Sequence, residues 1–233
     1  MTPSLAALVA LTLAQASPDA TTPTPTPTPA PVPPPAAPAE APLPVVPSLV
    51  SAEPLRGASL IEGYAGWPRL RLAYAQGLSH TSDLGGFADF DYSTTEFRAG
   101  LAYRGALIPP APPFDGALRF SLAWYHDSGS TWLYKGNHVD DGVYVGLGVS
   151  YSRGGQAGLF SLLADVPITV TFAKDGGVLV NPKASFAYEM PLYGPITVGV
   201  QVGLGLRFGY GYAPQKEAAG EFTLLGLASY RVL

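Results

Sequence analysis

The sequence predicts an all-β protein, an eight-stranded antiparallel up-and-down transmembrane β-barrel preceded by a disordered Pro-rich segment. Three observations support this prediction. Apolar residues alternate with polar or small ones from residue 68 onward, only 13% of the 233 residues are charged, and 13 of the 25 prolines lie between Pro18 and Pro47. Soluble proteins average about 25% charged residues, so the low charge content is atypical of a chain whose whole surface faces water.

The N-terminal part of the chain is expected to lie outside the barrel. Residues 5–13 form a short apolar run, and the small-x-small sequence Ala14-Gln15-Ala16 follows it. This pattern indicates a secretory signal peptide over residues 1–16, too short to span a bilayer. Residues 17–55 are rich in Pro, Thr and Ala. Pro fixes φ and lacks an N–H, so we expect an extended linker there and assign residues 56–233 to the barrel.

Alternation with a period of two locates the strands. Throughout residues 196–212, Val, Leu, Ile and aromatic residues alternate with Gly, Thr, Gln and Arg. This period indicates strand rather than helix, and the run exceeds the usual globular strand of about five or six residues. Eight such segments are predicted, at residues 68–79, 92–107, 117–127, 142–153, 159–173, 178–192, 196–212 and 221–233.

Two prolines interrupt the predicted ladder. Pro167 and Pro182 fall inside the fifth and sixth segments, where Pro removes a backbone hydrogen bond. Folding the hairpin about Lys174 and Asp175 brings the two prolines opposite each other. We therefore expect a local bulge or ladder gap at this point.

The connections between segments differ in character on the two sides of the predicted barrel. Those after the odd-numbered segments are mostly polar, whereas two of the other three are short and one is stiffened by Pro. Longer loops on one side and tighter turns on the other are typical of a barrel whose N-terminus lies in the periplasm. The predicted external loops 79–91 and 128–141 carry aromatic residues suited to contact with a partner.

Charge placement decides which face of the sheet meets lipid. An Arg or Lys that faces the middle of a bilayer costs about 2–4 kcal/mol, so the charged face is expected to line the lumen. That face carries Arg71, Glu96, Arg98, Arg104, Arg119, Lys183, Glu189, Arg207 and Arg231. Aromatic residues near segment ends are expected to form interfacial girdles, and these are Trp67, Tyr74, Tyr103, Trp124, Tyr151, Tyr188, Tyr210 and Tyr212.

The predicted strand number limits what the lumen can do. Eight strands enclose a space that side chains fill, which favours a structural or surface-interaction role. A narrow polar pore for small solutes is the alternative. Ten or more strands from the same residues would also open a pore, but the count of eight segments argues against that.

This layout resembles the small eight-stranded outer-membrane barrels of Gram-negative bacteria. It is similar to the transmembrane domain of the outer membrane protein A family and to the outer membrane protein X and W families, from Trp67 to Leu233. The resemblance implies residence in the outer membrane of a diderm bacterium, with the linker in the periplasm. It also implies contact with outer-membrane lipid and lipopolysaccharide, and the linker or outer loops are expected to meet a cell-wall or surface partner.

One polar group invites an enzymatic hypothesis. His126 and Ser128 share one face at the end of the third segment, and Asp140 begins the next strand and is expected to lie beside them. A Ser nucleophile, a His base and an orienting carboxylate are the groups that acyl transfer needs. The His-x-Ser pattern is similar to that of outer-membrane lipid A deacylases, although Gly129 replaces their Asn and Asp140 their Glu. We favour polar loop residues over a catalytic site.

Other chemistry finds little support in the sequence. Without Cys there is no disulfide, thiolate metal site or cysteine nucleophile. His80, His126 and His138 are not closely spaced, so we expect solvated loop histidines, no bound metal and no cofactor. A net charge of −4 gives no electrostatic reason for a nucleic-acid partner.

Overall fold

A computed structural model of the chain describes residues 47–107, 115–129, 139–155, 157–172, 176–211 and 219–232. The chain divides into two compact units, Met1–Glu40 and Ala41–Leu233, and the described residues all belong to the second. Among those residues, none lies in a helix that has both the length and the apolar character needed to cross a membrane.

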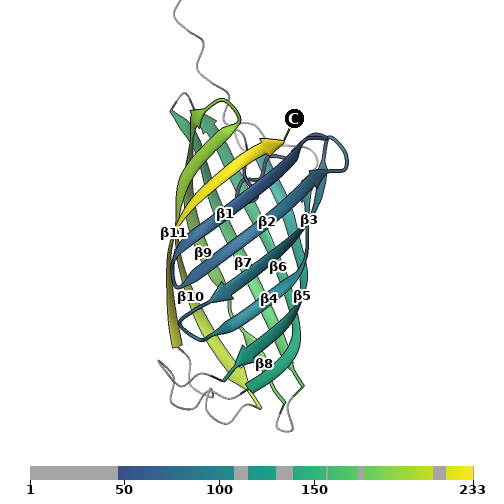
Figure 1. Cartoon of the computed structure of the whole chain (residues 1–233), viewed down its shortest axis with the longest axis vertical. Helices are drawn as coiled ribbons and strands as arrows, with labels where there is room; N and C mark the ends of the chain where they lie inside the picture. The colour runs from purple at the N-terminus through teal and green to yellow at the C-terminus, as the bar shows by residue number, and fades with distance from the viewer. Residues whose placement is uncertain are drawn as a thin grey trace, which may run out of the picture. The chain divides into compact units, whose positions relative to one another are not determined.

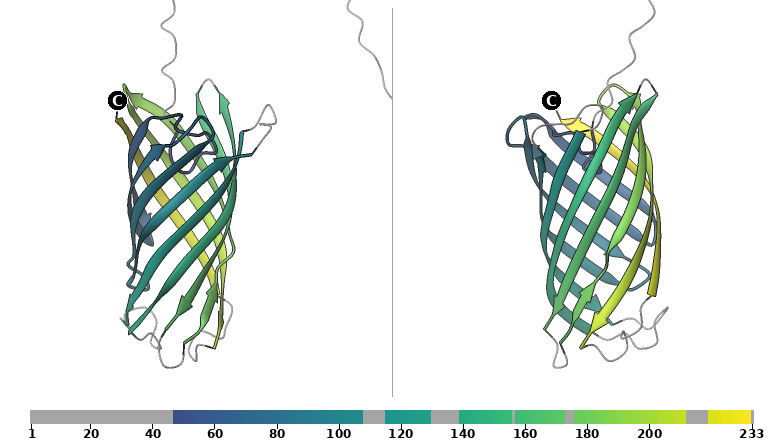
Figure 2. Two further views of the ribbon diagram at one scale, coloured as in Figure 1. Left: turned by 90° about the vertical axis from the view of Figure 1, so that its right-hand side faces the viewer. Right: turned by 180° about the vertical axis from the view of Figure 1, so that it is seen from behind.

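Antiparallel strands form one sheet that closes on itself as a barrel (Figures 1 and 2). The strands within the described residues are β1 Ser59–Trp67, β2 Arg69–Gly77, β3 Ser82–Asp91, β4 Glu96–Ala106, β5 Asp115–Ser128, β6 Val139–Gly155, β7 Gly158–Thr171, β8 Val178–Val180, β9 Lys183–Tyr193, β10 Ile196–Tyr210 and β11 Ala219–Val232. Pairing of β1 with β11, from Ser59 opposite Val232 to Trp67 opposite Leu224, closes the ring.

The ring has ten strand positions, so the predicted strand number of eight is wrong. The short β8 and the longer β9 both pair with β7 on one side and with β10 on the other. They therefore lie end to end at a single position. The two additional positions belong to β1 and β3, which the alternation did not reveal.

Both missed strands have inward faces that conceal the alternation. In β1 the inward side chains include the apolar Leu60 and Tyr64, which are buried, whereas Gly63 and Ala65 face outward. In β3 the inward side chains include three aspartates and Phe87. Most of the predicted loop 79–91 is therefore the strand β3, and its acidic residues point into the barrel.

The expected irregularity is confirmed as a gap between β8 and β9, but the register places Pro167 opposite Asn181 rather than Pro182. Backbone hydrogen bonds to the Pro167 and Pro182 carbonyls still cross the gap. Strand β7 runs through Pro167, but Asn181 and Pro182 separate β8 from β9. Ile168 pairs with Val180 on one side of the gap and Asp165 with Lys183 on the other. The register between β7 and its two partners is the same on both sides of the gap. No extra residue is therefore inserted, and the gap is not a bulge.

The outer face of the barrel is apolar around the ring. Large aliphatic and aromatic side chains project from every strand except β8 and remain exposed, among them Leu72, Leu101, Leu122, Leu147, Leu162 and Leu204. Neighbouring strands bring these side chains side by side, as where Leu101 lies opposite Leu122. Many charged residues of the same strands, by contrast, are buried, among them Glu62, Asp83, Glu96, Arg98, Arg104 and Glu189. Asp141 and Arg153, near the two ends of β6, are exposed.

Candidate functional site

The interior of the barrel holds a short segment of the chain itself. Residues 47–58, called the plug below, precede β1; seven of these twelve residues are buried, and only Arg56 and Gly57 are exposed. Their contacts, described next, are with inward-facing residues from strands around the ring, including β7, β9 and β11 as well as β1 to β6. The predicted linker extended to residue 55, but residues 47–55 lie inside the barrel, where their backbone polar groups find partners on its wall.

Arg104 of β4 is the principal anchor of the plug. Its guanidinium donates to the carbonyl oxygens of Ser48 and Ser51, at 2.6 and 2.7 Å. It also donates through Nε and Nη2 to the carboxylate of Asp83, at 2.7 and 2.5 Å. The Arg104 side chain is only 4% exposed. One buried cation thereby joins the plug to β3 and β4.

Three further hydrogen bonds fix the plug backbone. The N–H of Leu49 donates to Glu62 Oε2 at 2.8 Å, that of Ala52 donates to Ser152 Oγ at 2.7 Å, and that of Leu55 donates to Asp83 Oδ1 at 2.9 Å. A buried backbone N–H without a partner is costly. The inward polar side chains of the wall therefore satisfy a segment that has no strand partner.

Apolar packing supports the same placement. Val50 is 2% exposed and belongs to a cluster with Tyr64, Leu163, Ala187, Leu225 and Leu227. Leu49 packs against two other inward clusters, around Leu60 and around Phe87. Burial of such side chains contributes about 1.5–3 kcal/mol each. The inward apolar residues of this end of the barrel thus form a core around the plug.

A sharp turn leads from the plug into β1. Arg56 and Gly57 have φ of 52° and 88°, a left-handed conformation that glycine adopts without strain. Arg56 forms an ion pair with Glu53, with 3.8 Å between Nη2 and Oε1. Burial raises the pKa of Glu53 above its usual value, and the nearby Arg56 works in the opposite direction. The turn lets the chain leave the interior and immediately enter the wall.

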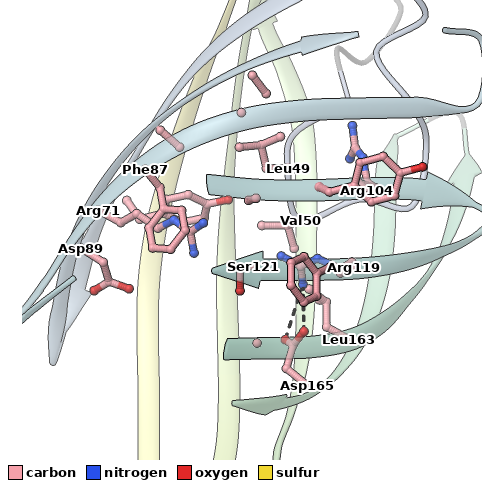
Figure 3. Close-up of a pocket in the computed structure, with 18 of the residues that line it drawn as sticks. Leu49, Val50, Arg71, Phe87, Asp89, Arg104, Arg119, Ser121, Leu163 and Asp165 are labelled. Carbon is pink, nitrogen blue, oxygen red and sulfur yellow. Dashed lines mark hydrogen bonds and ion pairs between the residues drawn. The ribbon is translucent and has the colours of Figure 1, made fainter. Parts of the chain in front are cut away.

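A lumen cavity of about 140 Å³ lies against the plug (Figure 3). Leu49 and Val50 form part of its wall, together with Arg71, Phe87 and Arg119. The guanidinium carbon of Arg71 lies 4.4 Å from the ring centre of Phe87 and 5.8 Å from that of Tyr64. Arg119 pairs with Asp165 at 3.4 Å. The cavity is therefore lined by both cationic and apolar side chains.

A second set of interior charges, called the ionic cluster below, lies nearer the opposite end of the barrel. Its members are Arg69, Asp91, Glu96, Arg98, Lys183, Arg207 and Glu221. Glu96 contacts both Arg98 and Arg207, the latter at 2.5 Å. Glu221 Oε1 forms ion pairs with Arg69 Nη2 at 3.1 Å and with Lys183 Nζ at 2.6 Å. Residues from β2, β3, β4, β9, β10 and β11 thus meet in the lumen.

The structure brings most of the nine proposed lumen charges into these groups. Arg104 holds the plug, Arg71 and Arg119 line the lumen cavity, and Glu96, Arg98, Lys183 and Arg207 belong to the ionic cluster. Glu189 is fully buried, and Arg231 pairs in the ladder with the inward Leu60. Sequence alternation did not identify five further interior charges, namely Arg69, Glu62, Asp83, Asp91 and Glu221. Opposite charges on neighbouring inward positions could have identified these residues, but recognising such neighbours requires the strand register.

The proposed girdle residues lie on the outside where they are described. Seven of the eight can be placed: Tyr188 is half-buried, and the other six are exposed, namely Trp67, Tyr74, Tyr103, Trp124, Tyr151 and Tyr210. Tyr212 lies outside the described residues. Trp67 and Tyr210 stand at the ends of β1 and β10.

The proposed catalytic group is not assembled as expected. His126 contacts Asp141, with 3.0 Å between Nδ1 and Oδ1, because these two residues pair across β5 and β6. Asp140 lies on the other face of the strand, opposite Asp127, and is buried. Asp140 is therefore the wrong carboxylate for orienting His126. Among the described hydrogen bonds, none joins Ser128 to His126.

No group of three or more His, Cys, Asp or Glu residues within the described ranges is arranged to hold a metal ion. His80 is exposed, and His138 lies outside the described residues.

Comparison with known proteins does not assign the chain to a family. No protein-family model matches it, and neither a curated protein nor a solved structure matches it. The structure shows a closed antiparallel barrel, and these comparisons do not support membership of the outer membrane protein A, X or W families or of the lipid A deacylases.

Proposed function

We propose that this chain is an integral outer-membrane β-barrel protein whose lumen is closed by its own N-terminal plug. The observation that carries the proposal is the apolar outer face combined with buried interior charge. Soluble monomers rarely expose contiguous apolar patches larger than a few hundred Å². A closed barrel also satisfies the condition that every backbone group in hydrocarbon has a partner, since no strand edge is left open.

The proposed role is structural or concerned with surface interaction. Among the described residues, the plug, the surrounding apolar side chains and the ionic cluster occupy much of the lumen, which supports a filled rather than an open resting barrel. Outer-membrane lipid and lipopolysaccharide are the proposed contacts of the apolar face. The linker before residue 47 is proposed to lie in the periplasm, where it is available to a cell-wall partner.

Membrane residence is tested with the full chain expressed in a diderm bacterium. We expect the protein in the outer-membrane fraction, extractable with detergent, with unboiled and boiled samples migrating differently on a denaturing gel. A folded barrel resists detergent until it is heated, which explains the expected difference. Recovery of a folded monomer in the soluble fraction without detergent would contradict the proposal.

A gated path for small solutes is the second candidate, and two observations favour it. The ring has ten strand positions, which enclose more space than eight. The plug that occupies this space is held by hydrogen bonds and packing, and since the chain has no Cys it is not disulfide-bonded.

Deletion of residues 47–55 separates the two candidates. If the plug closes a path, planar bilayers containing the deletion variant will show ohmic single-channel steps that the intact protein lacks. The matched control deletes residues 27–35, which removes the same length of chain but leaves the plug. Heat-modifiable migration verifies that each barrel is folded. Silence from a folded plug-deleted barrel would eliminate the gated path and leave the filled-lumen role.

A further inference from the structure

We propose that the lumen cavity beside the plug is a binding site for a small organic anion with a compact apolar body. This inference goes beyond the proposed membrane role, and it rests on the charge and shape of the cavity. In the view of Figure 3, Arg71 and Phe87 lie on one side, Arg119 and Asp165 on the other, and Leu49 and Val50 between them.

Arg71 is the cation that an anion would meet. Within the described residues, no carboxylate lies within 4.0 Å of its guanidinium, and its Nε is buried without a hydrogen-bond partner. The faces of Phe87 and Tyr64 cover part of the group, but aromatic faces do not accept the several N–H bonds that a guanidinium offers. An anionic oxygen in the cavity would supply that acceptor.

The other cations that line the cavity already have acidic partners. Arg104 pairs with Asp83 at 2.5 Å, and Lys183 pairs with Glu221 at 2.6 Å. Arg69 contacts both Asp91 and Glu221. Arg119 holds Asp165 at the longer distance of 3.4 Å, so its guanidinium retains more capacity for a second acceptor. The geometry therefore distinguishes Arg71 as the primary contact and Arg119 as the secondary one.

The negative charge of Asp89 repels the proposed anion, so a substitution of Asp89 provides a second test of the site. Asp89 lies on β3, opposite Arg71 in the ladder with β2 and opposite Arg98 in the ladder with β4. Its side chain also lines the cavity. Its negative charge weakens the attraction of an anion to Arg71. Removal of that charge is therefore expected to strengthen binding, the opposite of the effect expected at Arg71.

Cavity size and lining specify the rest of the ligand. A volume of about 140 Å³ is close to the roughly 150 Å³ of an apolar protein cavity known to hold benzene. Leu49, Val50, Phe87, Leu163 and Leu225 supply apolar surface. A single charged group on a ring or a short branched chain matches this combination, whereas inorganic ions and extended chains do not.

Binding is tested by calorimetric titration of the detergent-solubilised full chain with benzoate, and with benzyl alcohol as a neutral probe of similar size. We expect saturable binding of benzoate, at least about tenfold tighter than that of benzyl alcohol, because a hydrogen bond to a charged group contributes about 1.5–3 kcal/mol. Equal affinity of the two probes, or no saturable binding of benzoate at millimolar concentration, would overturn the proposal.

Three variants locate the site. Arg71→Gln is expected to weaken benzoate binding at least about tenfold and to leave benzyl alcohol binding nearly unchanged. Asp89→Asn is expected to tighten benzoate binding severalfold, and Arg153→Gln, an exposed arginine that does not line the cavity, serves as the matched control. Heat-modifiable migration establishes that each variant is folded. If Arg71→Gln and Arg153→Gln bind benzoate equally, the site is not the lumen cavity.

Discussion

Arg104→Gln is expected to destabilise the barrel by about 3–5 kcal/mol, since removal of one partner from a buried ion pair leaves an uncompensated charge. Arg104 is 4% exposed and is the ion-pair partner of Asp83. It also donates to the carbonyl oxygens of Ser48 and Ser51. Glutamine is neutral and too short to meet all three groups. Guanidinium-induced unfolding of vesicle-reconstituted protein, followed by tryptophan fluorescence, measures the change.

Two controls separate the buried pair from a general effect of removing an arginine. Arg153→Gln removes an exposed arginine, whose surface interactions contribute no more than about 1 kcal/mol. The double variant Arg104→Gln with Asp83→Asn leaves no buried unpaired charge, so it should recover a large part of the loss. If Arg104→Gln is no more destabilising than Arg153→Gln, the described anchoring of the plug is incorrect.

Leu101→Arg is expected to destabilise the barrel by about 2–4 kcal/mol, the cost of an arginine on the lipid face near the bilayer midplane. Leu101 lies at the centre of β4, is 58% exposed and pairs with Leu122. On a water-exposed surface the same substitution would change stability by no more than about 0.5 kcal/mol. The size of the effect in reconstituted protein therefore reports which solvent the side chain meets.

Val139→Arg is the matched control for that substitution. Val139 also projects outward and is 63% exposed, but it begins β6 at an end of the barrel. Near the membrane interface an arginine costs only about 0–1 kcal/mol. Equal and small effects of the two substitutions would place the apolar face in water.

Sequence alternation predicted the strands whose two faces differ in polarity. In β10, for example, Val200 and Val202 face outward and Gln201 inward, so the period of two is plain. In β1 the pattern is obscured, because the inward Leu60 and Tyr64 are large and pack on the plug, whereas the outward Gly63 and Ala65 are small. A strand that faces an internal core on one side and an apolar surface on the other shows no contrast.

The plug and its partners could not be predicted from local sequence. Ser48 and Ser51 follow a Pro-rich stretch and resemble its continuation, and their anchor Arg104 lies more than 50 residues away along the chain. Asp83 could not be predicted as an inward strand residue either, because Asp and Gly residues close together are typical of a turn. Only the ladder register, which places Asp83 opposite Arg104, reveals that the two charges meet.

Dependence on the strand register also explains why the proposed catalytic group contained the wrong carboxylate. Sequence spacing placed Asp140 near His126, but a shift of one residue moves a side chain to the opposite face of a strand. The observed register pairs His126 with Asp141 instead. Candidate sites that span two strands therefore depend on a register that a single sequence does not supply.

Spin labels at consecutive positions of β5 test most directly which face of the barrel meets lipid. The chain has no Cys, so single cysteines at each of residues 118–123 can be labelled in protein reconstituted into vesicles. We expect oxygen accessibility to peak at Leu118, Phe120 and Leu122, which project outward, with low accessibility to a polar nickel reagent at the same positions. High nickel accessibility at those three positions, or inward positions that are richer in oxygen, would contradict the membrane barrel.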